Sequence, residues 1–508
     1  MTVIELHFLS TRMNTMGQIS AFILGQAQRS FHDEKAVDHP LELMKGIAVK
    51  ALQDAGIEPE AVEGIGCVDP FSWTYSDLAT QVTNGIGCGN NVREFWLPAG
   101  GTTPQDLLHE ITIAMSKGEL DVALIVGAEA MRTRRKASRT GETLAWPTRD
   151  KSLSPTRGQK PFTSDWEAKH GLRLPIQSFP MNENALRHAN GRSAEAQIQL
   201  AAELLHKNAQ VAATNPHAWF QDAPSAEAIG TVSADNRMIA YPYTKRMNAI
   251  MDVDQAAALV VVSDRYLEKT GQHDRAVAVL GGAGAEELWN PIERPNLAKS
   301  LPMKKAFSWA LESAGLSIDD IHAFDLYSCF PAPVQMALAA LGIEVDDPRD
   351  FSITGGLAYA GGPGNNYVMH SLATAVSRIR ENPNQALLIT GVGMANTKHS
   401  GTVLSSASNI PTNATGKTVY RLETGEVATP VREQASGSAI IVTYTIEYDR
   451  DRAPHNVIYL LDNPDGSRAI ANARDPQLAA DTLLGDDPIG RQGSLEWDEE
   501  DQLQYFSL

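Results

Sequence analysis

Hydrophobic positions along this chain follow a helical spacing in two distant segments. In residues 44–65, apolar residues recur every three or four positions, a glycine follows, and then a short apolar run begins. This spacing predicts an amphipathic helix, a glycine stop and a buried strand. Residues 303–324 have the same pattern, which indicates an internal duplication. The residues that recur between the two segments are Met44/Met303, Lys45/Lys304, Ala51/Ala310, Leu52/Leu311, Ala55/Ala314 and Gly56/Gly315.

A second pair of segments supports the duplication. SKGELDVALIVGAEAM (116–131) and RENPNQALLITGVGMA (380–395) both read as the end of a helix, a turn and a strand. Their apolar runs are short, continuous and β-branched, as in strands that are buried on both faces. Strands that alternate with helices predict an α/β fold with mixed, mostly parallel sheets covered by helices. We expect one half at 18–131 and the other at 251–406.

The remaining segments differ from the two halves in composition and in hydrophobic pattern. Residues 132–250 are rich in Arg, Pro, Trp and Ser, and the spacing predicts one helix near 193–213 in a loop-like domain. A polar linker (407–418) precedes the last part of the chain. In residues 419–508, β-branched runs alternate around an Asn-Pro-Asp-Gly turn, which predicts a small antiparallel β-barrel of five or six strands.

Composition excludes several classes of protein. The chain has 508 residues and a net charge of −18, which argues against a nucleic-acid-binding protein, although a local pocket can still bind an anion. Its three cysteines (Cys67, Cys88 and Cys329) are widely spaced, so we expect a reducing compartment, no disulfide framework and no zinc site. The N-terminus lacks a signal-peptide pattern, and no apolar run approaches the roughly 20 residues of a membrane span. These signals predict a cytoplasmic location.

Four stretches together resemble the thiolase superfamily. They are DVALIVGAEAM (121–131), YPYTKRMNAIMDVDQAAALVVVS (241–263), DLYSCF (325–330) and GGLAYAGGPGNN (355–366). The likeness is greatest to the thiolase-like relatives of the sterol-carrier-protein thiolases that carry an extra C-terminal β-domain. The resemblance implies a duplicated thiolase fold, a loop domain, and chemistry that makes or breaks a carbon–carbon bond in an acyl-CoA thioester.

The reactive side chains of a working thiolase are missing. The family uses a nucleophilic cysteine, a histidine in a Gly-His-Pro loop and a second cysteine in a Cys-x-Gly loop. Gln105 matches a glutamine that follows the nucleophile by five residues, which places Gly100 at the nucleophile position. Gly362 replaces the histidine, and Gly391 and Gly393 occupy the Cys-x-Gly positions. A covalent cysteine mechanism therefore does not follow from these loops.

The DLYSCF segment carries the remaining candidate chemistry. It ends a predicted strand, where an open α/β sheet presents groups that contact ligands. Tyr327 is similar to a tyrosine of the steroid side-chain aldolases, which cleave β-hydroxyacyl-CoA by a retro-aldol step and act with a separate OB-fold partner. Tyr327 could exchange the hydroxyl proton or be a buried tyrosine bonded to backbone. Ser328 is its neighbour, and Cys329 is either a small core residue or an acyl-transfer nucleophile.

Four further side chains are candidates near the vacated positions. His399 follows the vacated Cys-x-Gly loop and is the histidine that we would place near the lost chemistry. His370 lies in the predicted helix after the glycine-rich loop, where packing against the sheet is the simpler reading. Asn365 and Asn366 either cap that helix or supply amide donors to a thioester oxygen.

A basic cluster begins the segment between the halves. In thiolases the corresponding region contacts coenzyme A, so Arg132 and Arg135 could hold its phosphates. A solvated basic loop surface is the alternative. The five cations within eight residues are Arg132, Arg134, Arg135, Lys136 and Arg139.

These observations support three functional hypotheses. The leading one is an acyl-CoA-binding enzyme that makes or breaks a carbon–carbon bond without a cysteine nucleophile, most concretely by retro-aldol cleavage of a β-hydroxyacyl-CoA. The second is a non-catalytic CoA-thioester binding or scaffold protein, and the third is an acyltransferase that uses Cys329. We expect no cofactor apart from the coenzyme A of the substrate, and no nucleic-acid partner. Since thiolases commonly form dimers or tetramers, a homodimer is expected unless the added domain covers the dimer surface.

Overall fold

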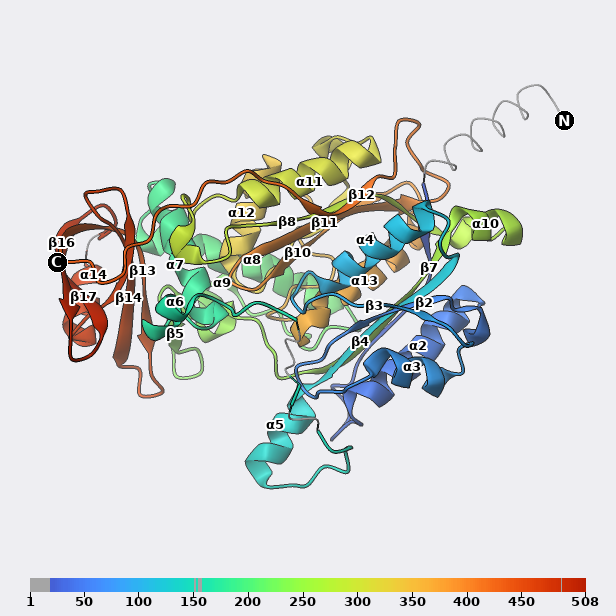
Figure 1. Ribbon diagram of the computed structural model, residues 1–508, viewed down its shortest axis with the longest axis horizontal. Helices are drawn as coiled ribbons and strands as arrows, with labels where there is room; N and C mark the ends of the chain where they lie inside the picture. Colours follow the sequence, from blue (N-terminus) through green and yellow to red (C-terminus); the bar gives the residue numbers. More distant parts are fainter. Residues whose placement is uncertain (1–18, 150–151, 154–157, 486) are drawn as a thin grey trace.

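The computed structural model describes residues 19–149, 152–153, 158–485 and 487–508, so the expected start of the first half at residue 18 and the N-terminal signal pattern lie outside the described residues. Two halves of the chain build one large sheet (Figure 1). One half of the sheet has the spatial order β3-β2-β4-β7-β1 and the other has the order β8-β11-β10-β9. Strand β7 lies in the first of these, although its residues were expected in the second half (251–406). Their bounds are β1 (Ala21–Ser30), β2 (Gly64–Val68), β3 (Arg93–Phe95), β4 (Val122–Ala130), β7 (Asp254–Ser263), β8 (Val277–Glu286), β9 (Ala323–Asp325), β10 (Ala386–Gly393) and β11 (Lys398–Ser406).

The two halves repeat the same strand order. In the second half, the N–H groups of Phe324 and Leu326 donate hydrogen bonds to the carbonyls of Asp350 and Phe351 at 2.9 and 2.8 Å. Residues 350–351 therefore lie beside β9 as β3 lies beside β2. The second half then reads 350–351, β9, β10, β11, β8, which matches β3, β2, β4, β7, β1 and supports the duplication predicted from the two repeated segments.

The sheet is mixed, as predicted, but its centre is antiparallel. Parallel pairs lie toward its two ends, where β2 pairs with β3 and β4, and β10 pairs with β9. The central pairs β4–β7, β7–β1, β1–β8, β8–β11 and β11–β10 are all antiparallel. The expectation of mostly parallel strands was therefore wrong, because an apolar run shows that a strand is buried but not which way its neighbour runs.

Helices cover both faces of the sheet and fill a central layer (Figure 1). Helices α4 and α13 contact each other and strands of both halves, so they lie between the two halves of the sheet. Nearly every side chain of α4 is buried, as expected for a helix surrounded by protein. The glycine stops predicted after α2 and α11 are left-handed residues, Gly56 (φ 66°) and Gly315 (φ 64°). The helices of this core are α2 (Pro40–Ala55), α3 (Leu78–Ile86), α4 (Thr103–Ser116), α10 (Asp264–Thr270), α11 (Leu301–Ala314), α12 (Pro331–Leu341) and α13 (Tyr367–Glu381).

The segment between the halves is more helical than predicted. The helix expected near 193–213 is α8, but α7 replaces much of the expected loop. The sequence did not predict α7, because Pro180 lies inside this helix and polar residues follow the proline. Packing against β13 and α12 outweighs these unfavourable local preferences. The elements here are α5 (Met131–Thr140), α6 (Asp165–Lys169), α7 (Pro175–Ala189), α8 (Ala194–Thr214), α9 (Ala226–Gly230), β5 (Met238–Ala240) and β6 (Tyr243–Thr244).

The C-terminal part forms the predicted barrel. Its five strands pair in the order β14-β15-β17-β16-β13, and β13 pairs with β14 to close the ring. One pair, β15 with β17, is parallel. The strand β12 (Thr418–Leu422) pairs with β8 of the large sheet, so the expected domain start at residue 419 falls inside a core strand. The barrel elements are β13 (Gly437–Tyr448), β14 (Pro454–Asp462), β15 (Arg468–Asn472), α14 (Pro476–Leu483), β16 (Gln492–Asp498) and β17 (Leu503–Ser507).

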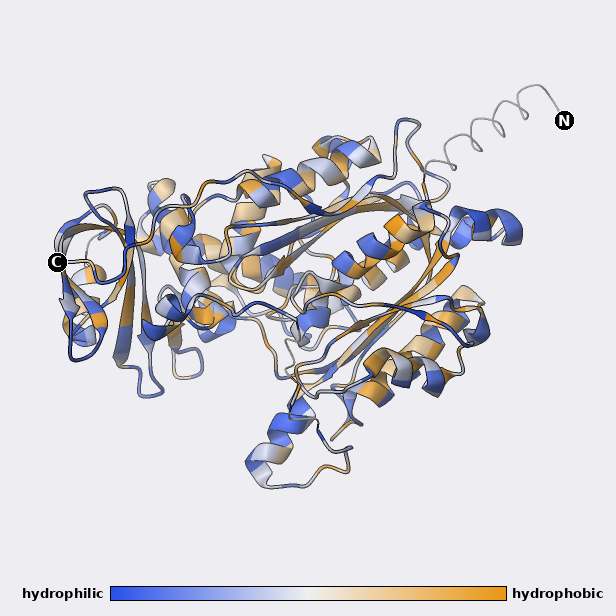
Figure 2. Ribbon diagram, in the orientation of Figure 1, coloured by the Kyte–Doolittle hydropathy of each residue, from blue (hydrophilic) through white to orange (hydrophobic). Residues whose placement is uncertain are grey.

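Hydropathy follows this architecture. Figure 2 shows hydrophobic residues along the strands of the large sheet, whereas α5 is hydrophilic along most of its length. Among the described residues, no helix combines the length and the apolar content needed to cross a bilayer.

Candidate active site

The turn before α4 touches the end of β10. A Cβ atom at Gly101 would overlap the carbonyl oxygen of Val392 and would lie 2.5 Å from the Tyr327 hydroxyl oxygen. A Cβ atom at Gly393 would lie 3.2 Å from the Gly101 nitrogen. The structure therefore brings together the two loops in which the resemblance places the lost cysteines, and Tyr327 lies beside Gly101.

Lys398 fills the space next to the nucleophile position, and the sequence did not single it out. Its side chain is 2% exposed, and its Nζ donates hydrogen bonds to the carbonyls of Pro98 and Ala99 (3.4 and 3.3 Å) and to the Gln159 amide oxygen. A Cβ atom at Gly100 would lie 3.5 Å from this Nζ. Burial lowers the pKa of Lys398. An amine therefore lies beside the position at which the resemblance places a thiolate.

His399 lies on the opposite face of β11. Side chains alternate along a strand, so Lys398 and Ser400 face α4 while His399 faces the other side. Its Nε2 lies 3.2 Å from a Glu287 carboxylate oxygen, and the ring is fully buried. The structure does not bring His399 to Tyr327.

Tyr327 is held by its main chain and by the packing of its ring. Its N–H donates to the Thr390 hydroxyl at 2.9 Å, and its ring lies edge-on to Tyr367 with centroids 5.5 Å apart. Burial raises the pKa of Tyr327 well above its ordinary value, so the phenol stays protonated at neutral pH. Ser328 is buried and its hydroxyl has no hydrogen-bond partner among the described residues. Burial also raises the pKa of Cys329, which disfavours the thiolate.

The glycine-rich loop closes the other side of the site. The N–H of Gly362 donates to the Ile250 carbonyl at 2.8 Å, and the N–H of Ala249 donates to the Cys329 carbonyl at 3.0 Å. Residues 249–250 therefore connect Gly362, where the family places its histidine, to the loop that follows Tyr327.

Asn366 is the least satisfied polar side chain of the site. It occupies the N-cap position of α13, yet it forms no side-chain cap bond, so the capping alternative is not realised there. The side chain is 1% exposed, and neither its amide nitrogen nor its oxygen has a hydrogen-bond partner among the described residues. It lies over Gly127 of β4, where a Cβ atom would overlap the Asn366 amide. The neighbouring Asn365 donates to the Asp69 carbonyl at 3.3 Å.

Glu129 lies under the same loop and was missed by the sequence analysis. A Cβ atom at Gly364 would lie 2.5 Å from its carboxylate, which accepts hydrogen bonds from the N–H groups of Phe71 and Ser72 at 2.6 and 2.9 Å. Burial raises the pKa of Glu129 to about 7, although these donors oppose the shift. The signal in the sequence was an acidic residue inside the otherwise apolar run DVALIVGAEAM.

Asp325 holds the loops of the site together. It is fully buried at the end of β9 and accepts six hydrogen bonds at 2.8–3.1 Å. These bonds tie β9 to the loop before the glycine-rich stretch and to the first turns of α13. The six donors are the hydroxyls of Ser352, Thr354, Tyr367 and Ser371 and the N–H groups of Ile353 and Thr354.

The basic cluster is a helix, not the expected loop. Helix α5 projects from the body of the molecule (Figure 1). Arg132 donates to the Glu34 carbonyl at 2.8 Å and lies 5.5 Å from the Trp219 ring. Arg135 is 48% exposed and lies 3.9 Å from Asp252. Arg135 therefore remains accessible to an anion, whereas Arg132 is partly engaged by the protein.

His370 packs against the sheet, and its burial predicts a pH effect. Its Nδ1 lies 3.1 Å from the Gln28 amide oxygen, and burial, assisted by the nearby His217, lowers the pKa of His370 to about 3. Between pH 6.5 and 3 the unfolded chain therefore binds one more proton at this residue than the folded chain. We expect its contribution to the free energy of unfolding to fall by about 1.4 kcal/mol per pH unit as the pH drops below 6.5.

Urea unfolding of wild type and His370→Gln between pH 7 and 4 measures this contribution as a difference. The difference in the free energy of unfolding should move in favour of the variant as the pH falls. His455→Gln is the matched control, because His455 is exposed and should leave the slope unchanged. Parallel pH curves for wild type and His370→Gln would contradict the prediction.

The fold is that of a thiolase-like protein, and glycines stand at the positions where the resemblance places the reactive thiols and histidine of a thiolase. A family model described as "Thiolase-like protein type 1 additional C-terminal domain" matches residues 422–500. More particularly, the chain is a relative of the SCP2-thiolase-like proteins of type 1. The solved structure of a monomeric SCP2-thiolase-like protein type 1 from Mycobacterium smegmatis is 29% identical, with a TM-score of 0.79 over 96% of this chain and 98% of that one.

Other relatives agree on the fold. Human sterol carrier protein 2 is 26% identical over 149 residues, which are 29% of this chain and 26% of that protein. The chain thus spans about a quarter of the length of the curated relatives that it matches. A structure titled "Ltp2-ChsH2(DUF35) aldolase" is 20% identical, with a TM-score of 0.60 over 77% of this chain and 99% of that one. Acetyl-CoA acetyltransferase from Syntrophomonas wolfei is 15% identical, with a TM-score of 0.54 over 76% of this chain and 99% of that one.

Proposed function

We propose that the protein binds an acyl-CoA thioester at the junction of its two halves and cleaves or forms a carbon–carbon bond without a covalent enzyme intermediate. The reaction that fits the side chains best is retro-aldol cleavage of a β-hydroxyacyl-CoA. The observation that carries the proposal is the buried, unpartnered amide of Asn366, which lies in the loop that follows Gly362 and over Gly127. Leaving a buried polar group unpaired costs about 1–3 kcal/mol, so its retention favours a role toward a ligand.

In this reaction a base takes the proton of the β-hydroxyl. The C–O bond becomes a carbonyl as the bond between Cα and Cβ breaks, and the electron pair moves to Cα and into the thioester as an enolate. The enolate then takes up a proton at Cα, which gives a ketone or aldehyde and a shortened acyl-CoA. Donors aimed at the enolate oxygen lower the barrier.

We assign the donor role to the phenol of Tyr327 and the amide of Asn366. Tyr327 stays protonated, so it suits a donor better than the base role that the sequence allowed. For the base we propose Glu129, whose pKa of about 7 allows proton exchange near neutral pH. Arg135 on α5 and its neighbour Arg132 are proposed to contact the phosphates of coenzyme A.

The alternative functions rest on different features of the site. A non-catalytic CoA-thioester binding protein is favoured by the side chain of Lys398, which packs beside Gly100, where the resemblance places the nucleophile. Acyl transfer by Cys329 has weaker support, because burial keeps this thiol protonated.

Mass spectrometry of a panel of β-hydroxyacyl-CoA thioesters, including steroid-derived ones, tests the proposal. We expect a shortened acyl-CoA together with a ketone or aldehyde. Tyr327→Phe keeps the ring against Tyr367 but removes the hydroxyl, so turnover should fall about 100-fold or more. Tyr266→Phe, in the peripheral helix α10, is the control and should keep wild-type turnover.

Three results would count against this proposal. Full turnover by Tyr327→Phe would remove the phenol from the mechanism. Unchanged thioesters, together with calorimetric binding of coenzyme A, would favour the scaffold function. An acyl adduct on Cys329 would favour the acyltransferase.

A further inference from the structure

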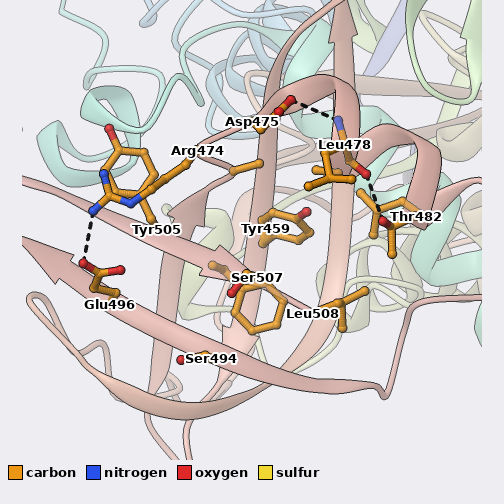
Figure 3. Close-up of a pocket in the computed structure, with 14 residues that line it drawn as sticks. Tyr459, Arg474, Asp475, Leu478, Thr482, Ser494, Glu496, Tyr505, Ser507 and Leu508 are labelled. Atoms are coloured by element: carbon orange, nitrogen blue, oxygen red, sulfur yellow. Dashed lines mark hydrogen bonds and ion pairs between the residues drawn. The ribbon is translucent and has the colours of Figure 1, made fainter.

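The C-terminal barrel contains a cavity of about 390 Å³ (Figure 3). Its floor is Tyr459 of β14 and Phe506 of β17, whose ring centroids lie 5.1 Å apart. Helix α14 provides one wall through Leu478 and Leu483. This cavity belongs to the appended domain and shares no lining residue with the candidate active site.

The cavity follows from the way the barrel closes. Strands β15 and β17 pair only through Asn472 and Tyr505, and the chain leaves β15 at that point to enter α14. Side chains of α14 therefore complete the wall in place of a longer strand. Side chains of a helix fill this side of the barrel less completely than a continuous pair of hydrogen-bonded strands would, and the cavity remains.

The floor of the cavity is apolar, and two exposed leucines lie at its mouth. Tyr459 and Phe506 are 2% and 3% exposed, whereas Leu478 and Leu508 at the mouth are 65% and 41% exposed. Polar side chains line the remainder of the cavity; among them, Thr482 donates its hydroxyl to the Leu478 carbonyl at 2.9 Å. A concave space of this volume with an apolar floor and a polar rim is typical of small-molecule sites.

The rim carries a negative charge. Arg474 stacks on Tyr505 at 4.0 Å and its guanidinium is already paired with Glu496 (3.2 Å) and Asp498 (2.5 Å). Asp475, another lining residue, caps α14 by accepting from the Leu478 N–H at 3.0 Å. Three carboxylates thus surround one neutralised cation, so the rim repels an anion.

We propose that this cavity binds an apolar molecule without negative charge, such as an alkyl compound with a neutral or cationic head. The apolar floor and walls take up the chain, and the rim carboxylates exclude carboxylates and phosphates. The cavity is then not a second site for the acyl-CoA or for free fatty acids. This inference does not depend on the proposed function of the core.

Three decyl probes that differ only in their head group test the proposal on the full chain. Calorimetry should detect binding of decan-1-ol and decyltrimethylammonium. Decanoate should bind at least about tenfold more weakly, because charge repulsion at the rim should cost about 1.4 kcal/mol. Glu496→Gln should strengthen the binding of decanoate. Equal affinities for all three probes would overturn the charge argument.

A cavity-filling variant tests the location. Ala479→Trp places an indole in the cavity and should abolish binding of decan-1-ol, whereas Gln477→Trp, on the exposed side of the same helix, should not. Leu478→Ser is a second variant at the exposed mouth, where folding tolerates a change, and it should weaken binding several-fold. Wild-type affinity in both Ala479→Trp and Leu478→Ser, or no binding of any probe to wild type, would overturn the proposal.

Discussion

Asp325→Asn should destabilise the protein by about 3 kcal/mol or more, because an amide cannot accept all of the hydrogen bonds that the carboxylate accepts. Each oxygen of Asp325 receives at least two donors, Tyr367 and Ser371 on one and the loop 352–354 on the other. Whichever carboxylate oxygen is replaced by the NH₂ group of asparagine, at least two buried hydrogen-bond donors then face another donor. The loss should appear as a lower midpoint of urea unfolding.

Function should be lost together with stability in Asp325→Asn. Asp325 connects the strand that leads to Tyr327 with the helix that begins after Asn366, so both proposed donors would lose their common support. Asp350→Asn is the matched control. Asp350 pairs with Arg378 at 2.8 Å on the surface, with 48% of its side chain exposed, and its loss should cost less than about 1 kcal/mol. Equal effects of the two substitutions would show that the buried network does not support the fold.

Gly101→Ala should cost about 3 kcal/mol or prevent folding, whereas Gly100→Ala should be tolerated within about 1 kcal/mol. A methyl group at Gly101 would overlap the main-chain carbonyl of Val392 and press on the Tyr327 hydroxyl. At Gly100 the nearest atom is the flexible Lys398 side chain, at 3.4 Å, which is ordinary contact. The two residues are adjacent, so composition and helix propensity are matched.

Thermal unfolding and turnover of the two glycine variants separate stability from chemistry. Gly100→Ala should keep wild-type stability, and its activity shows whether the nucleophile position of thiolases still contacts the substrate. A stable Gly101→Ala protein would contradict the close approach of the α4 turn to β10. In that case Tyr327 would not be held where the structure places it.

Local patterns in the sequence determined several helices and strands of the two halves and of the barrel. The repeated helix–glycine–strand segments predicted α2 with β2 and α11 with β9, because helical spacing and a glycine stop act within a few residues. Alternation and the turn at 463–466 predicted β14 and β15 of the barrel in the same way. From the sequence alone, the glycines at positions 100, 362 and 391 also predicted that the reactive side chains of a thiolase are missing, and this stays a prediction.

Only the tertiary structure decided which side chains meet at the site. Lys398 and His399 are neighbours in the chain, yet the pleat of β11 sends the lysine to Gly100 and the histidine to Glu287 on the other face. No local pattern shows that Asp325 accepts hydrogen bonds from residues up to 46 positions away. Nor does one show that the Asn366 side chain lies over Gly127 without capping α13. Helix α7 likewise forms despite its weak helix propensity, because it packs against β13 and α12. Long-range packing sets strand direction, side-chain facing and the closure of the barrel, and these contacts are not encoded within a short window of residues.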